Sequence, residues 1–162
     1  MKVEVKFDSK RALNNIRKIQ RQMPGVLTKA LRATAQFGVQ VIQDRTEKGV
    51  GYEGRFKAYS AQYRKAKSAG WPASKAGSKS FRPAFSGDTT GVVNLNVTGK
   101  MLGSMSSRSL GFNKAEIYFT RPTEGKKAAF NQEIRPFVGF NNSEKQRLEK
   151  FFNKQIEKAR IK

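Results

Sequence analysis

The sequence predicts a single α+β domain, residues 1–162, in which a mostly antiparallel sheet of about four strands packs against long helices. Three observations favour this class. Apolar residues recur at helical spacing in residues 27–42 and 148–159, and they alternate with polar residues in short stretches at the N-terminus and between residues 92 and 119. A chain of 162 residues with 37% hydrophobic content can bury one core of ordinary size.

The N-terminal part predicts one strand and two helices. Residues 1–7 alternate apolar and charged side chains, which is typical of a strand. Asp8 or Ser9 can then cap a helix, which we expect to be interrupted at Pro24 because proline lacks a backbone N–H. A second, longer helix follows and ends near Gly49, with an apolar stripe that most simply belongs to the core.

The C-terminal half predicts the remaining strands. Residues 92–97 alternate as a half-buried strand, and Thr98 is expected to cap a short amphipathic helix that carries residues up to Met105. Residues 106–110 and 115–119 flank a glycine-containing turn, which predicts a hairpin.

Two further helices are expected near the C-terminus. Ala128, Ala129, Phe130 and Ile134 fall about a helical turn apart before Pro136 forces an extended exit. The last helix is predicted to begin at a capping box formed by Ser143 and Gln146.

A long basic excursion, residues 54–91, interrupts this pattern and includes a short helical candidate at residues 60–67. From Gly54 through Gly87 it holds no acidic residue, and its composition suits an interface with protein, contact with nucleic acid or a solvated loop. The candidate interface residues are Phe56, Tyr59, Tyr63, Trp71, Phe81 and Phe85. The candidate contacts to DNA or to an acidic surface are Arg55, Lys57, Arg64, Lys65, Lys67, Lys75, Lys79 and Arg82.

Composition argues against an enzyme. The chain has no cysteine and no histidine, so thiolate sites, disulfides and the usual general base are missing. Asp44, Glu47 and Glu53 could be imagined around magnesium, but their spacing matches no known ligand loop and a solvated helix end is the simpler interpretation. We expect no cofactor and no metal. No apolar run is long enough to span a bilayer, and the first residues lack a secretory signal, which predicts a cytoplasmic product.

Several blocks in this order resemble a known family. They are the Asp44-Arg45-Thr46 segment with Gly49 and Gly51, the aromatic and basic stretch around Tyr59, and the blocks V-N-L-N-V-T-G-K-M-L-G-S-M and K-A-A-F-N-Q-E-I-R-P-F-V-G-F. The chain resembles the bacteriophage virion-morphogenesis and tail-completion proteins, over most of its length. No single block is specific, so the resemblance depends on their co-occurrence and order.

The resemblance implies a structural protein of the virion neck, at the head-proximal end of the tail, that assembles in the host cytoplasm as a homo-oligomeric ring. Its expected partners are other neck proteins, portal or connector proteins and tail-tube proteins, with possible contact to packaged DNA and none to a membrane. Adaptor, stopper and tail-terminator roles all stay open. The alternative is a sequence-independent nucleic-acid-binding protein, since the net charge of +21 requires an anionic or acidic partner.

Overall fold

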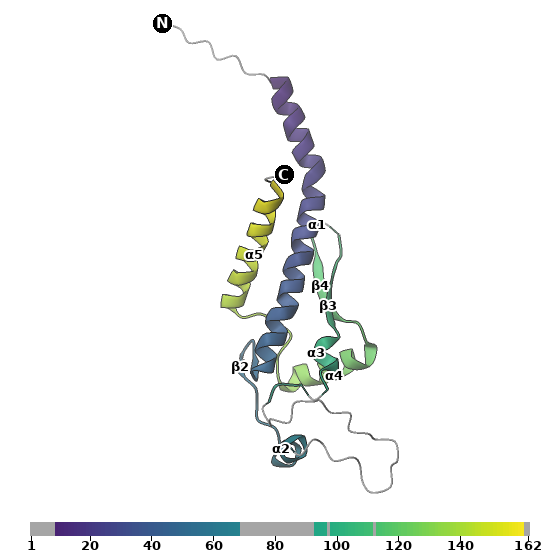
Figure 1. Cartoon of the computed structure of the whole chain (residues 1–162), viewed down its shortest axis with the longest axis vertical. Helices are drawn as coiled ribbons and strands as arrows, with labels where there is room; N and C mark the ends of the chain where they lie inside the picture. Colours follow the sequence, from purple (N-terminus) through teal and green to yellow (C-terminus); the bar gives the residue numbers. More distant parts are fainter. Residues whose placement is uncertain (1–8, 69–92, 97, 112, 161–162) are drawn as a thin grey trace.

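A computed structural model describes residues 9–68, 93–96, 98–111 and 113–160 (Figure 1). The described residues are mostly helical and include two small antiparallel sheets of two strands each. One long helix, α1 (Ser9–Glu47), forms the spine of an elongated molecule. The expected mixed class is therefore found, but the single sheet of about four strands is wrong.

Helix α1 is continuous through Pro24, so the predicted interruption is wrong. Proline in a helix interior removes one backbone hydrogen bond and costs about 3 kcal/mol relative to alanine. The packed apolar stripe beyond Pro24, which includes Val39 and Ile42, offsets that cost. The Thr28 hydroxyl also donates to the Pro24 carbonyl oxygen at 2.8 Å. The N-terminal part of α1 extends past the end of α5 (Asn142–Arg160) in Figure 1.

The larger sheet is a hairpin of β3 (Met105–Ser109) and β4 (Ala115–Phe119), which confirms the predicted hairpin. Its register pairs Ser107 with Ile117 at the centre. The smaller sheet pairs β1 (Val50–Gly51) with β2 (Gly54–Arg55), directly after α1.

The strand expected at residues 92–97 is not formed in the described residues 93–96, of which 93–95 form bends. One distant side chain and one local side chain bind this backbone in place of a neighbouring strand. The Leu95 N–H donates to the Tyr59 hydroxyl at 3.2 Å, and the Asn96 N–H donates to Asn94 Oδ1 at 3.1 Å. Leu95 itself has a positive φ of 52°, which a strand does not contain. The strand expected at residues 1–7 lies outside the described residues.

The remaining helices are α2 (Ala61–Ser68), α3 (Lys100–Gly103) and α4 (Pro122–Ile134). The cap of α3 is Gly99 in the left-handed conformation at φ 71° and not Thr98, and Met105 belongs to β3. Helix α5 was expected, but its capping box lies elsewhere than predicted. Asn141 Oδ1 accepts from the Glu144 N–H, and Glu144 Oε2 accepts from the Asn141 N–H, both at 2.9 Å.

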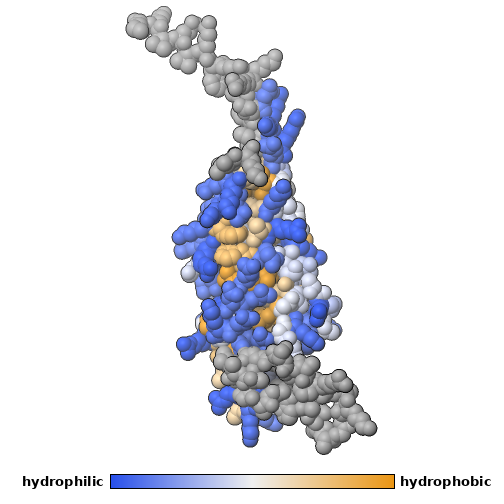
Figure 2. All heavy atoms as spheres, viewed as in Figure 1, coloured by the Kyte–Doolittle hydropathy of each residue, from blue (hydrophilic) through white to orange (hydrophobic). Residues whose placement is uncertain are grey.

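The core lies where the C-terminal half of α1 meets α3, α4 and the β3–β4 hairpin. Its buried apolar residues are Val39, Ile42, Leu95, Met101, Leu102, Met105, Ala128 and Phe137. On another side of α1, Phe37 stacks on Phe151 of α5 with ring centroids 4.6 Å apart. Figure 2 shows an apolar strip along this helix pair, bordered by hydrophilic side chains. Among the described helices, none has the length and apolarity that crossing a membrane requires.

Candidate interface groove

An open groove of about 700 Å³ lies between the segment that leads into α2 and the face of α4. Leu95, Met101 and the residues before α3 form part of its lining. The walls carry aromatic, aliphatic and basic side chains. They include Lys57, Tyr59, Tyr63, Lys127, Phe130, Asn131, Ile134 and Arg135.

The α4 wall presents large apolar side chains to solvent. Helix α4 begins with Pro122 at its first turn, a position where the missing N–H is not needed. Ala128 points into the core and is 2% exposed. Phe130 and Ile134, one turn apart, are 64% and 43% exposed and line the groove. Burying side chains of this size against a partner stabilises a complex by roughly 1.5–3 kcal/mol each before entropic costs.

Arg135 fastens the opposite wall to the end of α4. Its Nε donates to the Lys57 carbonyl oxygen at 3.0 Å and its Nη2 to the Ala58 carbonyl oxygen at 3.2 Å. The guanidinium also lies 4.8 Å from the centroid of the Tyr59 ring, a cation–π contact. Tyr59 in turn packs on Tyr63, with ring centroids 4.5 Å apart. Arg135 therefore determines the spacing between the two walls.

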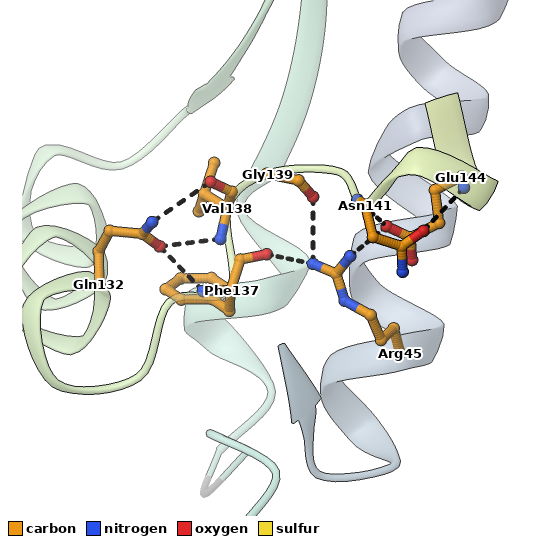
Figure 3. A network of polar contacts seen from close by, with 7 residues as sticks. All are labelled: Arg45, Gln132, Phe137, Val138, Gly139, Asn141 and Glu144. Carbon is orange, nitrogen blue, oxygen red and sulfur yellow. Dashed lines mark hydrogen bonds and ion pairs between the residues drawn. The ribbon is translucent and has the colours of Figure 1, made fainter. Parts of the chain in front are cut away.

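The segment that follows Arg135 is held by the buried guanidinium of Arg45 (Figure 3). Arg45 Nη1 forms an ion pair with Glu144 at 2.5 Å, while Nη2 donates to the carbonyl oxygens of Phe137 at 2.6 Å and Gly139 at 3.2 Å. On the other side, Gln132 Oε1 accepts from the backbone N–H groups of Phe137 and Val138. This network ties α1, α4 and α5 together.

Both hydrogen-bond capacity and charge explain why Arg45 is tolerated in the interior. A buried charge is stabilised when it is paired and its donors are bonded. The Arg45 guanidinium donates to one carboxylate and to two backbone carbonyl groups. Within the described residues, its Nε is the one nitrogen of the fork without a partner. The Arg-Thr segment noted in the sequence is thus a structural centre behind the groove.

The groove is basic as well as apolar. Lys57, Lys127 and Arg135 line it, and the acidic side chain on its wall, Glu124, pairs with Lys127 at 2.9 Å. Burial raises the pKa of the Tyr63 hydroxyl above its ordinary value, and the charge of Arg135 partly opposes that rise. Tyr63 is therefore neutral at physiological pH and can donate or accept one hydrogen bond.

The structure brings together some residues from the predicted interface set and from the predicted set of contacts to DNA or an acidic surface. Lys57, Tyr59 and Tyr63 line the groove, while Phe56 packs against the core. Arg55, Arg64 and Lys65 are exposed on β2 and α2. Lys67 is 2% exposed, and its Nζ donates to Asn94 Oδ1 at 2.7 Å. The predicted residues that lie outside the described part of the chain are Trp71, Lys75, Lys79, Phe81, Arg82 and Phe85.

Sequence reasoning missed the α4 wall. The expected helix groups Ala128, Phe130 and Ile134 together without assigning its faces, whereas Phe130 is two positions from Ala128 and so points to another side of the helix. The separate i, i+4 pair of Phe130 and Ile134 was the available signal. Arg135 gave no signal beyond its place before Pro136.

Comparisons with known proteins leave the function to physical argument. No protein-family model, no curated protein and no solved structure gives a significant match to this chain. In the described part of the chain, no group of three or more His, Cys, Asp or Glu side chains could hold a metal ion.

Proposed function

We propose that the protein is a structural subunit of a bacteriophage neck, a tail-completion or head–tail connector component that assembles as a ring. The order of the sequence blocks supports this class. The observation that carries the proposal is the groove, because its large apolar side chains stay exposed in the single subunit. An exposed apolar surface rimmed by polar groups is typical of a protein–protein contact.

A ring requires two different patches on each subunit, so that one subunit's patch contacts the other patch of its neighbour. The groove supplies one patch, on rigid elements fixed by Arg135 and by the Arg45 network. We assign its complement to the basic excursion of the adjacent subunit, whose residues Trp71, Phe81 and Phe85 are large apolar anchors. Aromatic anchors seated in such a groove would supply most of the binding energy.

Phe130→Asp tests the proposal. Aspartate in place of this phenylalanine should abolish oligomers, because it removes the largest exposed apolar side chain of the groove wall and puts in its place a carboxylate that is costly to desolvate, while the subunit stays folded. Glu133→Gln is the matched control, since Glu133 is exposed on α4 and does not line the groove. Light scattering after size exclusion gives the mass, and electron microscopy shows whether rings form. Rings of normal size from Phe130→Asp would contradict the proposal.

Nucleic-acid binding is the second candidate, favoured by the net charge of +21. Arg55, Arg64 and Lys65 are exposed, and Tyr59 and Tyr63 provide aromatic surface beside them. A protein that acts through phosphate contacts should lose affinity for DNA steeply between about 50 and 200 mM salt. Strong, steeply salt-dependent binding to random DNA by a protein that stays monomeric would favour this candidate over the ring.

A further inference from the structure

The β3–β4 hairpin has an outer edge that no described strand covers. The backbone bonds that bracket the ladder join Ser104 to Thr120 and Leu110 to Lys114. Along an antiparallel ladder, residue pairs joined by backbone hydrogen bonds alternate with pairs that are not. The even-numbered residues of β3 are therefore the ones that exchange backbone hydrogen bonds with β4. Met105, Ser107 and Ser109 therefore turn their N–H and C=O groups away from β4.

The free edge of β3 lies on the solvent side of α1. Ser107 donates from its hydroxyl to Gln36 Oε1 at 3.1 Å, and Gln36 is exposed. The β4 side lies instead beside buried Gly38, where an added methyl group would come within 3.4 Å of Ile117 and 2.9 Å of the Phe140 ring. The face of the hairpin that points away from α1 carries the Arg108–Glu116 ion pair. Among the described residues, no strand occupies the edge of β3 at Ser107 and Ser109, and a further strand could pair there.

The chain contains one segment with the matching pattern near its N-terminus. In residues 2–7, Val3, Val5 and Phe7 alternate with Lys2, Glu4 and Lys6. Such a strand, added to the edge of β3, would place its apolar residues on the side of α1 and its charged residues beside Arg108 and Glu116. Lys2, Glu4 and Lys6 include both positive and negative charges, and so does the hairpin face with Arg108 and Glu116 that they would extend.

This segment is too short to reach the edge of its own subunit. It is joined to Ser9, the first residue of α1, whereas Ser107 contacts Gln36 in the same helix. At 1.5 Å per residue, these two points on α1 are about 40 Å apart. Val3, six residues before Ser9, can extend at most about 22 Å. Pairing with β3 must therefore be made to another copy.

We propose that residues 3–7 of one subunit add as a strand to the free edge of β3 in the next subunit. Addition of an extended segment to an open edge gives affinity through backbone hydrogen bonds and specificity through alternate side chains. The contact is head to tail, because the donor segment and the acceptor edge are different surfaces. The inference rests on the proposed ring, for which it supplies a second intersubunit contact at a distance from the groove.

Disulfide cross-linking of the full chain tests the inference on a clean background, since the chain has no cysteine. A chain with Val5→Cys is mixed with a chain with Ser107→Cys and oxidised. Neighbouring strands bring Cα atoms to about 5.5 Å, which lies within the range for a disulfide. We expect a covalent dimer from the mixture, and a ladder of covalent multimers from the chain with both changes. Val3→Cys and Phe7→Cys, each mixed with Ser107→Cys, cover the neighbouring registers.

Two controls define the result. Val5→Cys mixed with Glu149→Cys should give no dimer, since Glu149 is exposed on α5 and belongs neither to the edge of β3 nor to the groove. Val5→Pro, which removes a backbone donor from the strand, should abolish multimers while leaving thermal unfolding of the subunit unchanged.

The possible results distinguish failure of the strand contact from failure of the proposed ring. An intrachain disulfide in the double variant, or an absence of cross-links from all three donor positions, overturns the inference. If no donor position gives a cross-link but electron microscopy still shows rings, the proposed function stands without the strand contact. Cross-linked open chains that never close support strand addition and overturn the ring.

Discussion

Two phenylalanines seven residues apart in the sequence have opposite environments. Phe137 is fully buried in the core, whereas Phe130 is 64% exposed in the groove. We expect Phe137→Ala to lower the free energy of unfolding by about 3–5 kcal/mol, because it removes packed ring atoms and leaves a cavity. Phe130→Ala, the same chemical change, should stay within about 0.5 kcal/mol of the parent protein. Urea unfolding followed by circular dichroism measures both, and equal losses would contradict this assignment of core and surface.

Removal of one partner of the Arg45–Glu144 ion pair should lower the free energy of unfolding by more than the loss of the charge attraction alone. Both side chains are about nine-tenths buried, so removal of one partner leaves the other charge without compensation. We expect Glu144→Ala to cost about 3–5 kcal/mol. Asn141→Ala, which removes one bond of the same capping box but keeps the ion pair, should cost about 1 kcal/mol. Urea unfolding of the two variants distinguishes the contributions, and a cost for Glu144→Ala no larger than that of Asn141→Ala would show that the ion pair adds little.

At the level of elements, Pro24 marks a weak point in α1. The residues before it extend beyond the packed part of the molecule, so their helix depends on local propensity more than on tertiary contact. Pro24→Ala restores a backbone donor and should strengthen the N-terminal part of α1 by up to about 3 kcal/mol. Hydrogen exchange should show slower exchange in residues 9–24 and unchanged protection around Ile42. Unchanged exchange in both regions would mean that Pro24 does not limit this part of the helix.

The elements that local pattern predicts best are those whose bonds are local. The β3–β4 hairpin, α4 and α5 follow from alternation, helical spacing and a cap near the start of α5. Residues 93–96 have the alternation of a strand, but the Leu95 N–H is bound by the distant Tyr59 hydroxyl, and no periodicity encodes such a contact. The continuity of α1 was missed for a related reason, since packing beyond Pro24 overrides a local preference.

The candidate site was predictable on one wall only. Tyr59 and Tyr63 were identified because aromatic and basic residues alternate in a stretch without acids. The other wall depends on which side of α4 faces the core, and that is decided by Ala128 and by the Arg45 network behind it. A spacing pattern indicates that a helix has an apolar side, but tertiary contact decides which apolar residues stay exposed.

For the whole molecule, the decisive question is whether the basic excursion acts through its aromatic residues or its charges. Buried aromatic anchors usually dominate interface energetics, whereas rim charges mainly change association rate and salt sensitivity. Trp71→Ala should therefore give a soluble subunit that cannot complete rings or particles. Lys75→Ala and Lys79→Ala should each have little effect at moderate salt, and they serve as controls in the same segment.

Limited proteolysis then tests the whole-molecule assembly directly. If the excursion docks in the groove of a neighbour, cleavage within residues 69–92 should be rapid in the free subunit and strongly slowed in the assembled ring, because binding removes this segment from the protease. Phe130→Asp, which cannot offer the groove, should remain as sensitive as the free parent subunit at any concentration. Equal sensitivity in the free and assembled states, or normal infectious particles from a chain lacking residues 70–80, would show that the excursion is a solvated loop. The groove would then need another occupant, and the strand contact at β3 would become the principal contact that closes the ring.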